Sequence, residues 1–290
     1  MNLDYFKILF FKLTLERFPN IFRPTSSPYI SGDGFRKISD HIFDESCTLD
    51  PNKINFNDIV FLNPELADIY FSNFHNQVSN KYYLVTHNSN IEIGKYIEKY
   101  IDEKIIHWFA LNLDLNHPKA TLIPYGLENL RRLRYGRKEW FKSKKFLKSE
   151  NYVLASFDIF KNYDEREPIL EILKNNKLVK FNKFSSKREY FYNLKSFKFL
   201  ICPRGQGYDT SRIWEGLLCG VYPILKLNEH SKILKEIGLP AIYLEDWNDL
   251  NNYDKQAFND FYTKFKNTKE FNINSFTHWK EKFKLLKSNY

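Results

Sequence analysis

A loop rich in glycine and arginine lies between an apolar run and a helical segment in the second half of the chain. The apolar run Phe199–Cys202 suits a strand buried on both faces, and Pro203 ends it. Glycines in the loop permit backbone paths that residues with a Cβ resist, and N-capping oxygens follow them. A glycine loop that opens on a helix N-terminus binds anions, because free N–H groups and the helix dipole point at the bound group. We expect eight residues to bind a nucleotide-sugar diphosphate donor: Arg204, Gly205, Gly207, Asp209, Thr210, Ser211, Arg212 and Glu215.

The charged side chains of this loop have separate expected roles. Arg204 and Arg212 bracket it and carry forked donors that match phosphate oxygens. Glu215 falls one turn inside the helix, where it can accept hydrogen bonds from sugar or ribose hydroxyls. The alternative is a structural turn, in which Arg212 and Glu215 pair at i,i+3 on a solvated face.

The segment from Cys202 to Ile224 resembles the donor-site segment of exostosin-like glycosyltransferases. Their pattern is roughly Pro-x-Gly, polar residues, Arg, an acidic residue and then a Gly-x-x-Pro-[IV] strand entry. The segment is also loosely similar to the donor segment of bacterial α-1,3-fucosyltransferases. Four earlier pieces look like bacterial and viral surface-polysaccharide transferases of this broad group: Ile30–Arg36, Thr86–Ser89, Trp108–Asn112 and Ile123–Asn129.

This resemblance implies a GT-B architecture, with two Rossmann-like domains facing a cleft and the donor held mainly by the C-terminal one. It also implies inversion at the anomeric carbon, with uridine as the preferred nucleotide and guanosine second. Inverting transfer needs a group that takes the proton of the acceptor hydroxyl. Asp33, flanked by glycines, and His87, whose ordinary pKa lies near neutrality, are the two candidates. Each has a structural alternative, Asp33 as a turn or cap residue and His87 as a hydrogen-bonded residue at a strand end.

The acceptor-side residues follow from where strands are expected to end. In the first half, strands are expected at 58–62, 81–86, 105–109 and 121–124, with helices at 64–79 and 91–101. This βαβ rhythm implies a parallel sheet that binds ligands at the carboxyl ends of its strands. The polar clusters 31–34 and 86–89 fall at such ends. We expect further acceptor or cleft residues at Arg36, Asn88, Tyr125 and Asn129.

The second half repeats the α/β pattern, with strands expected at 151–157, 178–181, 199–202, 222–226 and 241–244. The 290 residues are enough for two domains with their own cores. We therefore predict an N-terminal acceptor-side domain, residues 1–148, and a C-terminal nucleotide-sugar-binding domain, residues 149–290. The closing helix at 275–286 is a candidate to cross back onto the first domain.

A formal net charge of +9 favours anionic partners. Basic residues concentrate between the two halves, at Arg131, Arg132, Arg134, Arg137, Lys138, Lys142, Lys144, Lys145 and Lys148. Three interpretations stay open for this segment: a solvated face, a patch that contacts anionic lipid or a lipid-pyrophosphate acceptor, and a nucleic-acid surface. The last is disfavoured because no recognisable nucleic-acid-reading motif is present.

Cysteine usage and the opening residues bear on location. An odd cysteine count, with two of the three in apolar runs, favours reduced thiols and a cytosolic setting, peripheral to the membrane at most. The apolar stretch Tyr5–Leu15 is too short and too charged to span a bilayer, and it suits a core helix or one that lies on a membrane surface.

No Asp-x-Asp motif and no zinc-ligand spacing occur in the sequence, so the leaving diphosphate should be neutralised by arginine and a helix N-terminus without a metal. The sequence thus predicts a metal-independent glycosyltransferase that moves a sugar from a nucleotide diphosphate to a surface glycan or lipid-linked acceptor. Two alternatives stay open. One is a non-catalytic nucleotide-sugar binder or scaffold subunit, and the other is a basic nucleic-acid-binding protein.

Overall fold

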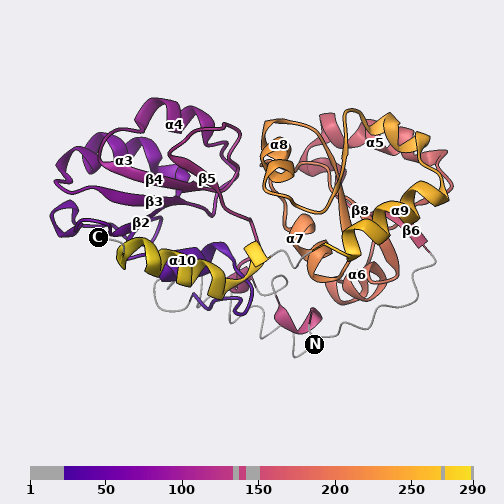
Figure 1. Ribbon diagram of the computed structural model, residues 1–290, viewed down its shortest axis with the longest axis horizontal. Coiled ribbons are helices and arrows are strands. Elements are labelled where there is room, and N and C mark those ends of the chain that lie inside the picture. The colour runs from indigo at the N-terminus through magenta and orange to yellow at the C-terminus, as the bar shows by residue number, and fades with distance from the viewer. Residues whose placement is uncertain (1–22, 133–136, 142–150, 269–271, 289–290) are drawn as a thin grey trace, which may run out of the picture. The chain divides into compact units, whose positions relative to one another are not determined.

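The computed structural model describes residues 23–132, 137–141, 151–268 and 272–288 (Figure 1). The chain divides into two compact units, which we call unit 1 (Met1–Lys138 with Asn272–Tyr290) and unit 2 (Glu139–Phe271). The stretch Tyr5–Leu15 and several members of the basic segment (Arg134, Lys142, Lys144, Lys145 and Lys148) lie outside the described residues. Within the described residues, no helix is both long and apolar enough to cross a membrane.

Unit 1 contains a five-stranded parallel sheet whose strands follow chain order. The strands are β1 (His41–Phe43), β2 (Ile59–Leu62), β3 (Tyr82–Thr86), β4 (Ile105–Ala110) and β5 (Ala120–Leu122). The helices of the unit are α2 (Gly32–Ile38), α3 (Ala67–Asn73), α4 (Gly94–Tyr100) and α10 (Phe276–Ser288). The strands are added in one direction along the sheet, and the crossovers between parallel strands have the same hand. Helices α3 and α4 therefore lie on the same face of the sheet. Figure 1 shows α10 on the opposite face.

The closing helix α10 packs on the sheet of unit 1. Trp279 and Phe283 join a buried cluster with Phe35 of α2 and with Phe61 and Phe109 of the strands. The ring centroids of Phe35 and Trp279 lie 5.3 Å apart in an edge-to-face arrangement. Residues of the C-terminal segment therefore complete the core of the N-terminal sheet, and the chain returns to unit 1 at Asn272.

Two local predictions for unit 1 were wrong. The cluster at 31–34 was expected in a loop after a strand, but Ser31 instead accepts a hydrogen bond from the Gly34 N–H and caps helix α2. The helix expected at 64–79 is divided into short 3-10 turns on either side of α3, at Pro64–Leu66 and His75–Gln77. The second turn points the buried His75 ring at Tyr82 and Asp102, and both ring nitrogens are within 2.9 Å of a partner oxygen.

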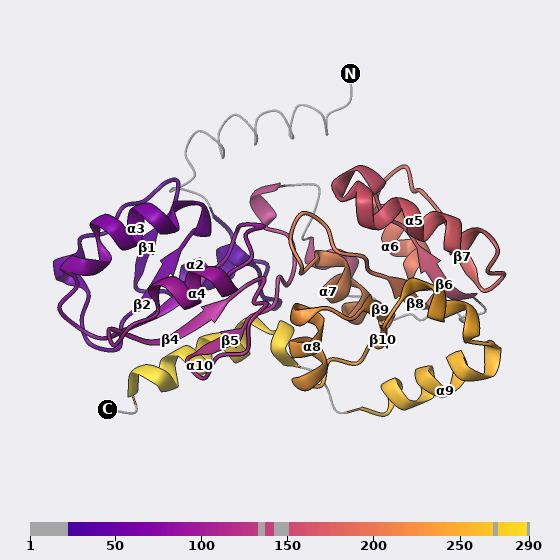
Figure 2. The same cartoon turned by 90° about the horizontal axis from the view of Figure 1, so that it is seen from above.

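Unit 2 also contains a five-stranded parallel sheet, in the order β10-β9-β8-β6-β7. Its strands are β6 (Asn151–Ala155), β7 (Val179–Phe181), β8 (Phe197–Ile201), β9 (Tyr222–Lys226) and β10 (Ile242–Leu244). Its helices are α5 (Tyr163–Lys174), α6 (Lys187–Leu194), α7 (Ser211–Leu218), α8 (Glu229–Glu236) and α9 (Lys255–Lys266), which Figure 2 shows from above. Both sheets are compatible with a Rossmann-like α/β fold.

The strand order of unit 2 predicts where it binds ligands. The first strand, β6, lies between β7 and β8, so the chain winds away from it in both directions. In open α/β sheets, ligands bind outside the carboxyl ends of the strands at such a reversal point. The loops that follow β6 and β8 meet at this crevice, and the second of them carries the glycine–arginine segment.

Candidate functional site

Helix α7 begins directly after the glycine–arginine loop of unit 2. Its N-cap residue, Thr210, is extended (φ −131°, ψ 144°), and the Thr210 side chain makes no capping hydrogen bond. The helix N-terminus therefore keeps backbone donors that its own cap does not satisfy. Asp209 is engaged elsewhere, since the Trp214 indole N–H lies 2.9 and 3.0 Å from its two carboxylate oxygens. The Asp209 carboxylate thus stabilises the first turn of α7 through its hydrogen bonds with Trp214.

Arg212 joins the two loops of the crevice. Its Nε donates to the carbonyl oxygen of Ser156, directly after β6, at 3.0 Å. The alternative pairing of Arg212 with Glu215 is not formed, because no carboxylate of the described residues lies within 4.0 Å of a guanidinium nitrogen of Arg212. The Arg212 side chain is thus fixed by a neutral carbonyl.

Arg204 is held at the side of the loop. Its backbone N–H donates to Oε1 of Glu165 at 3.1 Å, and its Nε lies 3.8 Å from Oε2 of the same carboxylate. Its guanidinium carbon lies 4.3 Å from the centre of the Tyr208 ring. Burial raises the pKa of Glu165 even though Arg204 acts to lower it. Arg204 and Glu165 line a small pocket together with Tyr208, Lys226, Asn228 and His230.

The glycines of the loop do not use a left-handed backbone. Among the described residues, positive φ occurs at three other glycines, Gly126, Gly220 and Gly238, and Gly220 (φ 72°) follows the C-terminus of α7. Gly205 instead lies close to a side chain, because a Cβ there would be 3.4 Å from Nη2 of Arg166. Gly207 accepts a hydrogen bond from the Gly205 N–H at 3.1 Å.

Several buried oxygens near the start of α7 have no hydrogen-bond partner. They are Oε2 of Glu215, Oγ1 of Thr210 and the hydroxyl oxygen of Tyr190 on α6. Glu215 is 1% exposed, so an unpartnered carboxylate oxygen there is costly unless another group donates to it. Ser211, the first residue of α7, is half-buried beside Thr210. Hydroxyl groups of a ligand would satisfy these oxygens.

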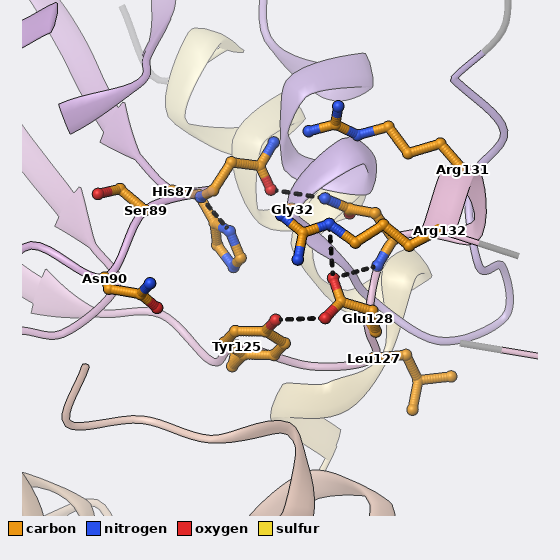
Figure 3. A pocket seen from close by; sticks show the side chains of 11 residues that line it. Gly32, His87, Ser89, Asn90, Tyr125, Leu127, Glu128, Arg131 and Arg132 are labelled. Atoms are coloured by element: carbon orange, nitrogen blue, oxygen red, sulfur yellow. Dashed lines mark hydrogen bonds and ion pairs between the residues drawn. The ribbon is translucent and has the colours of Figure 1, made fainter. Parts of the chain in front are cut away.

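Unit 1 contains a second candidate site, a pocket of about 60 Å³ at the carboxyl end of β3 (Figure 3). Among the residues predicted for the acceptor side, it brings together His87, Asn88, Tyr125 and Asn129. Arg36 and Asp33 do not line it. Arg36 is instead paired with Asp44, whose Oδ2 lies 2.6 Å from the arginine Nε. The remaining lining residues are Gly32, Ser89, Asn90, Leu127, Glu128, Arg131 and Arg132.

Asp33 lies behind this pocket, in a buried ionic network. One carboxylate oxygen is 3.2 Å from Nη1 of Arg23, and the other is 3.3 Å from Nε of Arg131. Asn88 donates to the carboxylate at 3.3 Å, and the Asp33 N–H donates to the side chain of Asn129 at 2.8 Å. The Asn129 amide then donates to Asn88 at 2.8 Å, which closes the network. The Asp33 side chain therefore connects α2 to two loops.

The glycine before Asp33 makes this network possible. A Cβ on Gly32 would lie 1.8 Å from Oδ1 of Asn88 and 2.5 Å from Nδ1 of His87. Any side chain at this position would therefore displace both residues. The space beside Gly32 is therefore occupied by the protein's own Asn88.

His87 lines the pocket with both ring nitrogens engaged. Its Nδ1 accepts from the Asn88 N–H at 2.7 Å, and its Nε2 lies 3.2 Å from the carbonyl oxygen of Pro124. This pattern requires the proton on Nε2. Burial lowers the pKa of His87 to about 4, against the smaller opposing effect of its hydrogen bonds to Pro124 and Asn88. The ring is neutral at pH 7.

Sequence reasoning missed the carboxylate that this pocket contains. Glu128 accepts from the Tyr125 hydroxyl at 2.9 Å and from the Asn129 N–H at 3.1 Å, as Figure 3 shows. Arg132 approaches the same carboxylate at 3.8 Å from a more exposed position. The signal was present, since Glu128 lies between Tyr125 and Asn129 in the segment quoted for the resemblance.

The comparisons with known proteins bear on unit 2 and on the C-terminal segment of unit 1 that contains α10. The family model described as the RXYLT1 C-terminal domain matches residues 157–289. This is an exostosin-family-related glycosyltransferase domain, so the match supports a glycosyltransferase family and a glycosyltransferase-like function for the chain. A comparison with curated proteins gives no match. The matched residues include the glycine–arginine loop and α7.

Proposed function

We propose that the protein is an inverting glycosyltransferase of the GT-B type. It would transfer a sugar from a nucleotide diphosphate, UDP first and GDP second, to a surface glycan or a lipid-linked glycan. Unit 2 would bind the donor and unit 1 the acceptor. The observation that carries the proposal is Arg212 at the first turn of α7, fixed by the Ser156 carbonyl and without a carboxylate partner in the described residues.

The donor-binding residues divide into groups by the chemistry that they offer. Arg212, Ser211 and the backbone of α7 offer donors to the diphosphate. Glu215 and Thr210 offer buried oxygens to hydroxyls of the ribose or the sugar. Arg204 is the rim cation, since Glu165 and Tyr208 already engage it. Gly205 and Gly207 bring the loop backbone near the ligand, and Asp209 supports α7 through Trp214.

On the acceptor side, we assign the proton-accepting role to Glu128. Its carboxylate lines the pocket, whereas Asp33 lies behind it between two arginines. His87 is a poor base at neutral pH because its pKa is about 4. Glu128→Gln should then lower turnover far more than donor affinity. Transfer assays on Asp33→Asn and His87→Gln test the other two candidates, and an active Glu128→Gln enzyme would contradict our assignment.

The direct test of the function is a thermal-shift screen of the full chain against UDP, GDP, CMP and their sugars. A ligand that binds only the folded state raises the apparent stability. We expect the largest shift with UDP or a UDP-sugar, and loss of that shift in Arg212→Ala. Donor hydrolysis without acceptor then separates an enzyme from the non-catalytic binder or scaffold subunit. Salt-sensitive binding of random oligonucleotides, with no response to any nucleotide sugar, would favour the nucleic-acid alternative.

We further propose that transfer needs no metal and takes place in the cytoplasm, peripheral at most to the inner membrane face. No group of three His, Cys, Asp or Glu side chains suited to a metal occurs among residues 23–132, 137–141, 151–268 and 272–288. Metal independence stays a prediction, supported by the two-arginine loop. Activity lost in EDTA and restored by Mn²⁺ would contradict it.

A further inference from the structure

Arg166 of α5 is a buried cation beneath the glycine–arginine loop. Only 1% of the residue is exposed. Its Nη1 donates to the carbonyl oxygen of Asp158 at 2.6 Å, in the segment that follows β6. Its Nε and Nη2 donate to the carbonyl oxygens of Arg204 and Pro203, at 2.8 and 3.2 Å. One guanidinium thus connects the two loops that meet at the reversal point of the sheet.

A neighbouring hydrogen bond strengthens this connection. The Asn162 side-chain amide donates to the carbonyl oxygen of Gly205 at 3.1 Å. Three successive carbonyl groups, those of Pro203, Arg204 and Gly205, are therefore turned toward the α5 side of the loop. With its carbonyls held there, the loop cannot turn those oxygens toward an anion on its other side.

The charge of Arg166 has no direct counter-ion. No carboxylate of the described residues lies within 4.0 Å of its guanidinium nitrogens. Burial lowers the pKa of Arg166 to about 10, and the positive charge of Arg212 lowers it further, while the more distant carboxylates of Glu165 and Asp158 act to raise it. Two arginines at one crevice therefore act on each other, and both are held by neutral carbonyls. Such an arrangement is costly without a ligand and favours a bound anion of more than one charge.

We propose that Arg166 is a positioning residue of the donor site: it presets the loop at 203–205 and, with Arg212, supplies the positive charge that a diphosphate neutralises. This inference rests on the proposed function, and it adds a residue that the motif does not contain. Arg166 lies upstream of the motif on another helix, so only the fold brings it to the loop. With Arg166 included, the crevice contains two arginines, Arg166 and Arg212, that are not paired with a carboxylate of the described residues, although Arg204 is paired with Glu165.

The test is calorimetric binding of inorganic pyrophosphate and of UDP to the full chain, in wild type, Arg166→Gln, Arg166→Lys and Arg188→Gln. Arg188 is an exposed arginine on α6 of the same unit, so its substitution removes an equal charge away from the crevice. We expect Arg166→Gln to weaken pyrophosphate binding by roughly 10- to 100-fold, the range for one charge-assisted hydrogen-bonding group. Arg188→Gln should stay within about 2-fold, as expected of an exposed charge.

A second measurement separates positioning and charge from a purely structural role. Arg166→Lys, which keeps the buried charge, should retain more of the pyrophosphate affinity than Arg166→Gln, which removes it. If Arg166→Gln does not fold, the pyrophosphate affinity of Arg166→Lys tests the role of Arg166. Lysine keeps the charge but cannot make the same three-carbonyl fork, so we expect roughly a 3- to 10-fold weaker affinity.

The outcomes distinguish this inference from the function on which it rests. Tight binding of pyrophosphate and UDP by wild type, with equal affinity in the folded Arg166 variant, would overturn the role of Arg166 and leave the donor site intact. Equal pyrophosphate affinity in Arg166→Lys and Arg166→Gln would overturn its electrostatic part. Wild-type protein that binds neither pyrophosphate nor UDP would overturn the donor site itself and this inference with it.

Discussion

The pocket of unit 1 and the crevice of unit 2 contain similar side chains but arrange their charges in opposite ways. Around the unit 1 pocket, arginines and carboxylates are paired: Asp33, Asp44, Glu45 and Glu128 each lie within 4.0 Å of an arginine. In the unit 2 crevice, Arg166 and Arg212 are held by carbonyl oxygens, while Asp209 accepts from an indole. Paired charges suit a neutral, hydroxyl-rich ligand, and separated charges suit an anion.

The ion pairs of unit 1 also shift the pKa values of their members. Although burial opposes it, hydrogen bonds from Arg36 and Ser46 lower the pKa of Asp44. Likewise, Asp33, Glu45 and Asp44 raise the pKa of Arg23 against the effect of burial. Asp44 and Arg23 therefore both stay charged near neutrality. In unit 2, Arg166 and Arg212 are held by carbonyl oxygens and, of these three crevice arginines, only Arg204 is paired with a carboxylate of the described residues, and this difference supports the two proposed roles.

The largest expected effect comes from Arg212→Ala, which removes the cation at the start of α7. We expect kcat/KM for sugar transfer to fall by an amount equivalent to about 2–4 kcal/mol of transition-state stabilisation. Steady-state transfer assays with the best donor from the thermal-shift screen measure this loss. Arg188→Ala, at an exposed position on α6, serves as the control. Equal activity in the two variants would contradict a specific role for the Arg212 charge in the crevice.

The next effect concerns the pH dependence of stability through His87. Its pKa is about 4 in the folded protein, because of burial, and near 6.5 in the unfolded chain. Between these values the unfolded chain binds the extra proton, so the free energy of unfolding falls as the pH falls from 6.5 toward 4. From pH 7 to pH 5 this contribution amounts to about 2 kcal/mol.

His87→Gln should remove that contribution. Urea denaturation at pH 7 and pH 5 gives the change in the free energy of unfolding for wild type and for His87→Gln. The difference between these two changes is the contribution of His87. Burial lowers the pKa of His107 in the same direction, so the wild-type curve alone does not isolate His87. Identical pH dependence in wild type and His87→Gln would show that the ring is accessible to protons in the folded state.

A smaller effect is expected from Asn129→Ala, which opens the network behind the unit 1 pocket. The variant removes the acceptor of the Asp33 N–H and the donor to Asn88. Leaving these buried groups unpaired should lower the free energy of unfolding by about 1–3 kcal/mol. Chemical denaturation measures the change, with exposed Asn251→Ala as control. Pyrophosphate affinity should stay unchanged, and a parallel loss of that affinity would contradict the separation of the two sites.

The smallest effect is expected from Arg204→Gln. Glu165 and Tyr208 already engage this side chain at the rim, so its loss should raise KM for the donor by an amount equivalent to about 1 kcal/mol. Donor titrations at saturating acceptor measure it. A loss as large as that of Arg212→Ala would mean that Arg204 leaves Glu165 when the donor binds.

Short-range patterns were enough to predict most elements of the fold. The run at 222–226 predicted β9 with its observed bounds, because a buried parallel strand needs a continuous apolar stretch. The helix after the glycine–arginine loop was also predicted, although the side chain of its N-cap residue Thr210 makes no capping hydrogen bond. The edge strand β1 was missed, since a strand of three residues is too short to show a periodic signal. The helix at 64–79 was overestimated because its apolar spacing continues past Asn73, where tertiary hydrogen bonds redirect His75.

What the sequence determined by itself is therefore local: the strand–loop–helix segment at 199–226 and the presence of arginines beside a helix N-terminus. Only the tertiary structure decided which charges are paired, that Glu128 and not Asp33 faces the unit 1 pocket, and that Arg166 lies under the loop. The reason is physical. Capping and apolar periodicity depend on residues a few positions apart, whereas electrostatic pairing and burial depend on segments that meet only after the sheets have formed.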